Sequence, residues 1–491
     1  MSENISFKSF YYSLGTTSFR MQNFNQKIEQ QLDLLNQFWQ KPEYKNEKWE
    51  SNELIQAAYY NFIKESDFLK EGDAPRKAKD ARQKTSGMRD IGLIDDNRRL
   101  TPVGKKLLEI SKSGDFTSDN FLQIPKDSYI YFLQLLKTYV EIDNDTVIRP
   151  FILLAKLLKK FDFLLQHEFM YLFPLCIDKK TTDFIIEKLE KNRTKENVDS
   201  IITEIFMKQK NYKAALDYFL NEKTVIEETF CKVGLNRKSK DYDRAYLPLY
   251  NTIRKVYFDD DKSDSAILKL YEASEIGNIK THWRKFLFKT SSGTAIRKSP
   301  KEELERANMF SNISEEAKFK EVFFKTMHLI KIKRTLEDYF DLNRRYLKIS
   351  DTLLFADNQV KFDVIPRYYF SLVPDDFYNL AFKKSDDLQE LKKMEDISPF
   401  LKLDEEKLLK LINKENKTNF TKIADIKQFV ADERTERFNR LIDEKFTDKN
   451  LITILELFKN RKSPADDKAI QEFVTDEADG PTIFEYILAI V

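Results

Sequence analysis

Residues 91–104 read Ile-Gly-Leu-Ile-Asp-Asp-Asn-Arg-Arg-Leu-Thr-Pro-Val-Gly, and this stretch decides the local fold. Residues 91–94 are an apolar segment typical of a short strand. Residues 95–97 are short polar residues that tolerate the positive φ of a hairpin turn, and residues 98–100 return as a second strand. Thr101 suits a helix N-cap, and Pro102 suits the first helical position, where a missing N–H costs nothing. The stretch therefore predicts strand, turn, strand and helix.

The segments before this hairpin predict helices. Apolar residues recur at spacings of three and four over residues 23–39 and again over residues 53–69. Residues 77–88 predict a helix, or a turn followed by a helix, with few apolar residues. Helix, helix, two-stranded wing and helix is the order of a winged helix-turn-helix, a module that reads DNA. We therefore expect a mainly α chain with small β wings, built from winged helix-turn-helix units and a helical linker.

The charges around the hairpin favour the same interpretation. From Arg76 to Lys106 the chain carries ten Lys/Arg and four Asp, a surplus of +6, whereas the whole chain of 491 residues has a net charge of only +2. A DNA duplex carries one phosphate charge about every 1.7 Å, so a dense local surplus is what binding requires. The alternative is a solvated charged helix beside an ordinary hairpin.

Candidate DNA contacts follow from this region and from the turn-like residues 14–20. We expect the helix before the wing to reach base edges or flanking phosphates, and the wing to hold the DNA backbone. The candidates are Arg20, Arg76, Lys77, Lys79, Arg82, Lys84, Arg89, Arg98 and Arg99.

A second basic segment spans residues 276–301, where seven cations occur without an acid. Ser and Thr residues add hydrogen-bonding groups, and Trp283 and Phe286 are expected to anchor the segment. Phosphate contact is the functional interpretation, and an exposed basic loop beside an acidic surface is the alternative. The candidates here are Lys280, Arg284, Lys285, Lys289, Arg297 and Lys298.

The remainder of the chain predicts a domain order. Residues 128–235 and 377–462 predict helices, and residues 334–348 predict a helix followed by strand, turn and strand over 352–362, which residues 365–371 continue. The expected divisions are a recognition region over 1–145, a helical subdomain over 146–275, a second winged-helix-like unit over 276–375, a helical linker over 376–463 and the start of another domain over 464–491.

Composition and motifs exclude several classes of protein. Gly occurs only 10 times, so glycine-rich phosphate loops and doubly wound nucleotide folds are not expected. Cys176 and Cys231 are too few for a disulfide framework or a zinc finger, and they fit a reducing, cytoplasmic location. The three histidines are too scattered for a metal site, and no run of about 18 apolar residues predicts a membrane span.

One motif imitates a nuclease site. Pro374-Asp375 followed by Glu390-Leu-Lys392 matches the Pro-Asp…Glu-x-Lys pattern in which carboxylates hold Mg²⁺. Such residues normally stand on paired strands, whereas residues 386–394 predict a charged helix. We therefore do not expect an active site there.

A series of short stretches points to one family. They are Leu-Gly-Thr-Thr-Ser-Phe-Arg at 14–20, Phe-Asn at 24–25 with Ile-Glu at 28–29, Asp-Ala-Arg at 80–82, Gly-Leu-Ile at 92–94, Leu-Thr at 100–101, Gly-Lys at 104–105, Asn-Phe-Leu-Gln at 120–123, Arg-Pro-Phe at 149–151, Asp-Glu-Arg at 432–434, Asp-Glu at 443–444 and Pro-Thr-x-Phe-Glu-Tyr at 481–486. Together they resemble the AlwI family of type IIS restriction endonucleases, which includes BstNBI-type nicking enzymes. The resemblance covers nearly the whole chain.

The resemblance implies a function. Family members recognise a short asymmetric site in double-stranded DNA through winged-helix-like units and hydrolyse it a few bases away with Mg²⁺ in a C-terminal nuclease domain. Glu485 matches the acid of the first nuclease helix and would be both a catalytic residue and a metal ligand. The remaining carboxylates would follow beyond Val491, so we expect this chain to bind DNA, as a monomer on its site, without cutting it. The alternatives are a non-catalytic winged-helix regulator and a helical interaction scaffold.

Overall fold

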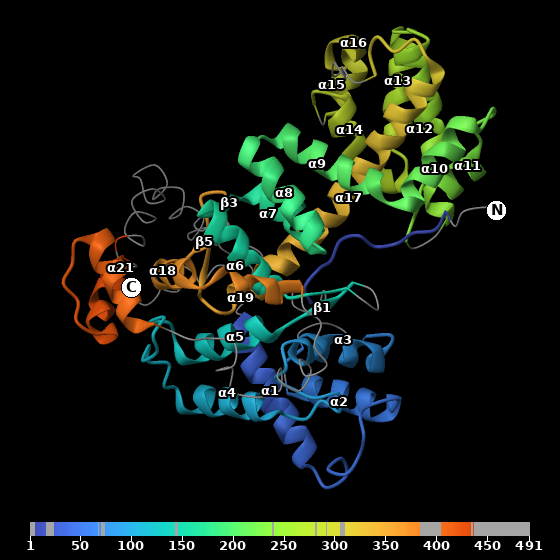
Figure 1. The fold of residues 1–491 in the computed structure, drawn as a ribbon. Helices are drawn as coiled ribbons and strands as arrows, with labels where there is room; N and C mark the ends of the chain where they lie inside the picture. Colours follow the sequence, from blue (N-terminus) through green and yellow to red (C-terminus); the bar gives the residue numbers. More distant parts are fainter. Residues whose placement is uncertain are drawn as a thin grey trace, which may run out of the picture. The chain divides into compact units, whose positions relative to one another are not determined.

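The computed structural model describes residues 5–15, 24–66, 68–69, 74–142, 146–237, 240–279, 282–290, 292–304, 310–382, 404–433 and 436. These residues are mainly helical with small antiparallel sheets, as expected from the sequence (Figure 1). The chain divides into two units: an inserted unit of residues 1–12 and 167–340, and a host unit of residues 13–166 and 341–491. No helix in the described part of the chain is both long and apolar enough to cross a bilayer.

The host unit begins with helices that match the predicted N-terminal region. Its elements are α1 (Phe24–Gln40), α2 (Glu53–Glu65), α3 (Lys77–Asp90), α4 (Pro102–Ser113), α5 (Lys126–Lys137), β1 (Val140–Glu141), β2 (Val147–Ile148), α6 (Pro150–Phe161), β3 (Phe163–Leu165), β4 (Leu353–Ala356), β5 (Gln359–Phe362), α18 (Val364–Leu372), α19 (Asp375–Asn379), α21 (Glu405–Asn416) and the 3-10 turns η6 (Leu380–Phe382) and η7 (Ile423–Asp425).

An aromatic core holds the first helices of the host unit together. Phe38 of α1 stacks on Tyr44 at 4.4 Å between ring centroids and meets Tyr59 of α2 edge-on at 5.3 Å. Trp49, in the connection between α1 and α2, also meets Tyr59 edge-on. Offset and edge-on pairs of this kind contribute about 0.5–1.5 kcal/mol beyond the area they bury. They fix α1 against α2, on which α3 packs.

The predicted hairpin forms in a shortened version. The two arms meet in a single antiparallel bridge, Ile94 with Leu100, and the turn is closed by the Asp95 and Arg99 backbones at 2.9 Å. Arg98 adopts a φ of 59° in this turn. The second arm is short because α4 begins at Pro102. The predicted pair of strands is thus a tight turn with one bridge.

The larger sheet of the host unit joins segments that are far apart in the sequence. Its strand order is β3-β5-β4, all antiparallel, with Leu164 opposite Val360 and Phe355 opposite Val360 on the other side. Asp357 and Asn358 both have positive φ, as a two-residue type I′ hairpin requires. The predicted strand-turn-strand over 352–362 is therefore confirmed.

Three sequence predictions in this region were wrong. Residues 163–165 and the paired β1 and β2 lie within 128–235, which was predicted to be helical. α6 ends because Asp162 takes a φ of 64°, after which Phe163–Leu165 find a partner in β5. Residues 365–371 form helix α18 instead of continuing the strands, with Asp363 as its N-cap residue.

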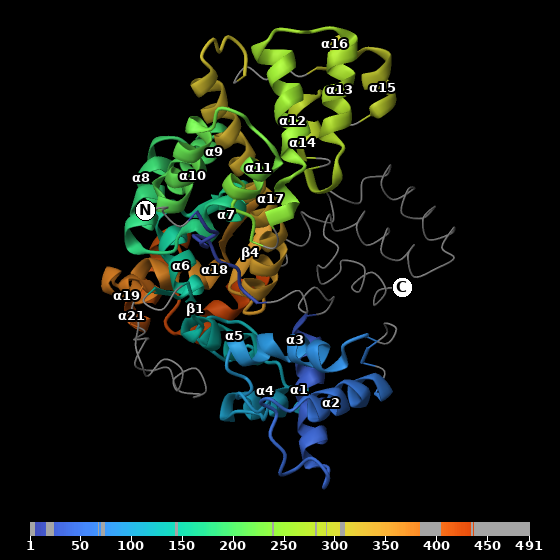
Figure 2. The same ribbon diagram turned by 90° about the vertical axis from the view of Figure 1, so that its right-hand side faces the viewer.

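The inserted unit is mainly helical in its described part (Figure 2). Its elements are α7 (Gln166–Tyr171), α8 (Lys179–Lys191), α9 (Lys195–Lys208), α10 (Lys210–Asn221), α11 (Glu227–Val233), α12 (Tyr246–Ile253), α13 (Asp264–Ser274), α14 (His282–Leu287), α15 (Gly293–Lys298), α16 (Pro300–Glu303), the short turns η2 (Phe173–Leu175), η3 (Lys240–Asp243), η4 (Arg254–Phe258) and η5 (Gly277–Ile279), and α17 (Glu316–Lys348), which ends in the host unit.

Polar side chains of α17 form hydrogen bonds with the carbonyls at the C-terminal end of α11. Burial lowers the pKa of His328 well below its ordinary value, and its neutral ring donates from Nε2 to the Val233 carbonyl at 3.0 Å. Lys331 donates to the Gly234 carbonyl and pairs with the fully buried Asp243 at 2.6 Å. Carbonyls at a helix C-terminus have no partner within the helix, so these contacts fix α11 on α17.

Candidate nucleic-acid interface

A close junction joins the hairpin to α4. Thr101 is the N-cap residue: its hydroxyl accepts from the Gly104 N–H at 3.1 Å and donates to the Gly92 carbonyl at 2.8 Å. A Cβ on Gly104 would lie closer than 3.0 Å to the carbonyl oxygen of Leu93, so only glycine fits there. The Thr-x-x-Gly pattern therefore locks the helix onto the hairpin backbone.

Helix α3 has one buried face and one exposed face. Ala81, Thr85 and Met88 are fully buried, and α3 packs closely on α2. The exposed side carries Lys79 and Gln83, which are one turn apart. This is the arrangement that a groove-binding helix requires, since its base-reading side chains must face solvent before DNA arrives.

Several α3 side chains that were predicted to contact DNA form contacts with other residues of the host unit. Arg82 donates to Gln56 and lies 3.6 Å from Glu53, both on α2. Lys77 donates to Asn61 of α2 at 2.9 Å. Another candidate of this group, Lys84, lies 3.8 Å from Asp80 on the same helix and is only 18% exposed. The contacts of Arg82 and Lys77 brace α3 on α2.

The arginines at the hairpin also have internal partners. Arg98 is 6% exposed, donates from Nε to the Thr85 hydroxyl at 2.9 Å and lies over the Trp49 ring. Burial lowers the pKa of its guanidinium to about 10. Arg99 lies 4.3 Å from the Trp39 ring centroid and donates to the carbonyls of residues 45 and 47. The structure therefore places both arginines in the support of the hairpin.

The remaining cations of this region stand at the surface. Arg76 and Lys79 are exposed at the start of α3, and Lys105 is exposed on α4. Arg89 is 46% exposed and lies 3.5 Å from Asp90 and 3.8 Å from Asp96, a geometry of modest energy in water. Lys105 and Gln83 were not among the candidates predicted from the sequence. Their exposure to solvent identifies them, and exposure depends on the fold.

The second basic segment is anchored by Trp283, one of the two residues expected to anchor it. Trp283 and Ile296 are fully buried, and Trp283 stacks on Phe323 of α17 at 5.8 Å. Arg284 is engaged with Glu275 at 2.9 Å and is 17% exposed. The exposed candidates in this part of the inserted unit are Lys285, Lys289, Arg297 and Lys298, of which Lys289 donates to the Glu302 carbonyl.

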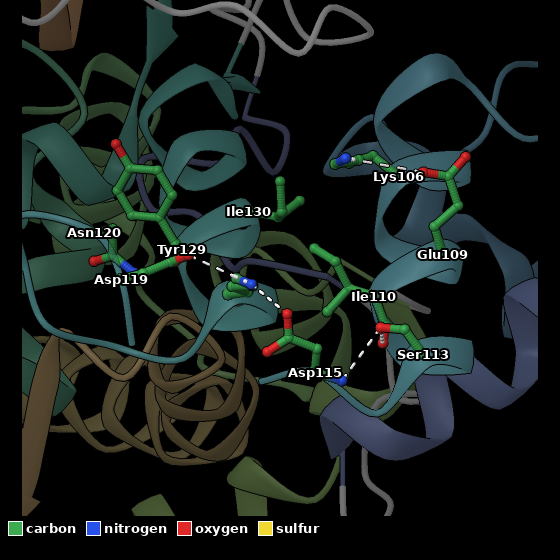
Figure 3. A pocket seen from close by; sticks show the side chains of 10 residues that line it. Lys106, Glu109, Ile110, Ser113, Asp115, Asp119, Asn120, Tyr129 and Ile130 are labelled. Carbon is green, nitrogen blue, oxygen red and sulfur yellow. Dashed lines mark hydrogen bonds and ion pairs between the residues drawn. The ribbon is translucent and has the colours of Figure 1, made fainter. Parts of the chain in front are cut away.

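A hollow of about 390 Å³ opens between α4 and α5 (Figure 3). Lys126, one of its lining residues, pairs with Asp115 and, at 3.4 Å, with Asp119, and Lys106 faces Glu109 at 3.9 Å. The lining thus carries two cations and three acids. This balance does not attract phosphate, so the hollow lies outside the candidate interface.

Some candidates fall outside the described residues. These are Arg20, Lys280, Glu485, Glu390 and Lys392. Asp375, the first acid of the nuclease-like motif, begins α19 and pairs with Lys159 at 2.9 Å. Within the described ranges, no three His, Cys, Asp or Glu side chains are grouped so that they could hold a metal ion.

Comparisons with known proteins identify the family. No curated protein matches the chain. Residues 89–491, most of the chain, match the AlwI restriction endonuclease family, and this range includes the hairpin, Thr101 and Gly104 described above. The chain therefore belongs to the AlwI restriction endonuclease family.

Proposed function

We propose that this chain recognises an asymmetric site in double-stranded DNA for a type IIS restriction endonuclease. Membership of the AlwI family implies DNA cleavage of the type II restriction class and therefore binding to duplex DNA. The observation that carries the recognition proposal is the exposed Lys79–Gln83 side of α3, on a helix fixed by α2 and followed by a tight hairpin. We further propose that the protein works as a monomer in the cytoplasm.

We assign two winged-helix-like arrangements to this function. The first consists of α1, α2, α3 and the hairpin at Ile94 and Leu100. The second consists of α6, β3, the end of α17, β4 and β5. The strand order β3-β5-β4, with a helix before β3 and before β4, supports the second assignment. A winged helix places one helix in the major groove and its hairpin beside the DNA backbone.

The contacts that we propose are those candidates that the fold leaves at the surface. In the host unit they are Arg76, Lys79 and Arg89, to which we add Lys105. In the inserted unit they are Lys285, Lys289, Arg297 and Lys298. Lysine mainly neutralises phosphate, whereas arginine also pairs with guanine.

Restriction endonucleases of this kind generally use Mg²⁺. The proposed ligand and catalytic residue is Glu485, which lies outside the described residues. Elsewhere, among the residues that the structure describes, no suitable group of metal ligands occurs.

The test of the proposal is duplex binding as a function of salt. Fluorescence anisotropy with a labelled duplex, from 50 to 200 mM salt, should show a steep loss of affinity, because each phosphate contact releases counterions. Lys79→Ala and Lys105→Ala should each reduce the slope of log K against log salt by about 1. Lys410→Ala is the matched control, since Lys410 is also exposed but lies on α21. A flat salt response would refute phosphate contact.

The alternative, a winged-helix regulator, makes a different prediction. A regulator normally binds a palindrome as a dimer, because protein and site share a two-fold axis. Sedimentation of the complex should give one chain per duplex if the restriction proposal holds. Two chains on a palindrome selected from random duplexes would favour the regulator.

A further inference from the structure

The exposed side of α3 contains one long side chain that is polar but uncharged. Gln83 lies in the middle of the helix, is exposed, and follows Lys79 by one turn. Ser86 follows Gln83 by three residues, and its hydroxyl donates to the Gln83 carbonyl at 2.8 Å. Gln83 is therefore the long amide on the side of α3 that faces solvent.

The arginine beside Gln83 is held by another helix. Arg82, its neighbour, is directed to Gln56 and Glu53 of α2. A guanidinium held by acids of its own fold must lose those charged contacts before it pairs with guanine. The amide of Gln83 is uncharged, so pairing with a base exchanges one hydrogen bond for another and separates no opposite charges.

The backbone of α3 is held rigidly behind this position. Thr85 is buried and accepts the Nε–H of Arg98, and the Gly87 carbonyl accepts from the hydroxyl of Tyr346 at 3.1 Å. The Ile91 carbonyl, just after the helix, accepts from Gln134 of α5 at 2.7 Å. α3 is thus fixed at its centre and its end, so Gln83 is presented from a defined position. Base readout needs such precision because a bidentate pair tolerates little displacement.

We propose that Gln83 reads an adenine in the recognition site, through the bidentate pair that a glutamine amide forms with adenine N7 and N6 in the major groove. The inference rests on the proposed function, since it requires α3 to lie in the major groove. Lys79, one turn earlier, contacts the adjacent phosphate. Gln83 therefore determines specificity, and Lys79 contributes affinity.

The experiment selects binding sites from a library of duplexes with ten random base pairs. The whole chain is used, in parallel with Gln83→Ala, Gln83→Glu and the control Lys79→Ala. The unmodified chain should enrich a site with an invariant A·T pair. Gln83→Ala should reduce the preference at that pair by about 5- to 150-fold and leave the other positions unchanged. Gln83→Glu should shift the preference towards cytosine, whose N4 amino group donates to a carboxylate.

The control separates reading from binding. Lys79→Ala should weaken binding to all duplexes evenly, with the same selected sequence. Gln83 is exposed, so its variants should match the unmodified chain in thermal unfolding. Selection of the same sequence by Gln83→Ala and the unmodified chain would overturn the inference while leaving the proposed function intact. Failure of the unmodified chain to bind any duplex would overturn both.

Discussion

Gly104→Ala is the sharpest test of the hairpin and helix junction. The added methyl group would lie closer than 3.0 Å to the Leu93 carbonyl oxygen. This oxygen belongs to the backbone, so it cannot rotate away as a side chain could. Either α4 or the hairpin must therefore move. Movement would stretch the bonds from Thr101 to the Gly92 and Leu93 carbonyls.

The magnitude follows from three contributions. Overpacking of this kind costs about 1–3 kcal/mol. A weakened hydrogen bond of Thr101 costs about 1 kcal/mol more. Replacing Gly by Ala inside a helix returns about 1 kcal/mol through helix propensity. We therefore expect Gly104→Ala to lower the free energy of unfolding of the host unit by about 1–3 kcal/mol.

Urea titration followed by tryptophan fluorescence measures this change. Trp39 donates to the Arg98 carbonyl and Trp49 lies near the Arg98 side chain, so both report on the hairpin. The control is Gly114→Ala, which adds the same methyl group where nothing lies within 4 Å. Its φ of 66° is left-handed, so alanine there costs about 1–2 kcal/mol through strain alone. A Gly104→Ala protein as stable as the unmodified chain would refute the close approach.

Three further predictions concern buried charges. Burial and the charge of Asp127 raise the pKa of Glu29 from 4.5 to about 7, so between these pH values the folded chain holds a proton that the unfolded chain has lost. The free energy of unfolding should therefore fall as the pH rises from 4.5 to 7, by up to about 1.4 kcal/mol per pH unit. Glu29→Gln should flatten that dependence in urea titrations, and an unchanged pH profile would contradict the assignment. Arg98→Ala should destabilise the host unit by about 1.5–3 kcal/mol, because Thr85 loses a charged donor, yet leave the salt slope of DNA binding unaltered; a smaller slope would instead place Arg98 on the DNA. Lys331→Ala leaves Asp243 buried without its ion-pair partner and should destabilise the inserted unit by about 3–5 kcal/mol. Urea unfolding followed by Trp283 fluorescence measures the change, and a loss below about 1 kcal/mol would argue against the pair.

Local sequence signals predicted the local structures of this protein well. Thr101-Pro102 predicted the start of α4, and residues 352–362 predicted a strand, turn and strand, because caps and turns depend on a few neighbouring residues. Strand β3 was missed because Phe163–Leu165 continue the apolar periodicity of α6. Their partner strand lies about 200 residues later, at a distance that no local pattern can report.

The candidate interface shows the same limit. A count of charges identified the region of α3 and the hairpin, but it could not tell which cations face solvent. Arg82 and Arg98 find partners in Gln56 and Thr85, from segments that only the fold brings close. Gln83 carries no charge, so a search for basic residues passed over it. Its position became informative only once the buried face of α3 was known.

The pairing of β3 with β5 has a consequence for how the chain is made. A ribosome releases β3 long before it releases residues 359–362, so the strand must wait while residues 167–340 of the inserted unit emerge. Contacts of such long sequence separation slow folding, because the intervening loop must close first. The inserted unit can fold during this interval and shorten the loop that remains to be closed. The host unit is therefore the part completed last, and β3 stays unpaired, and so open to misassembly, until residues 359–362 emerge.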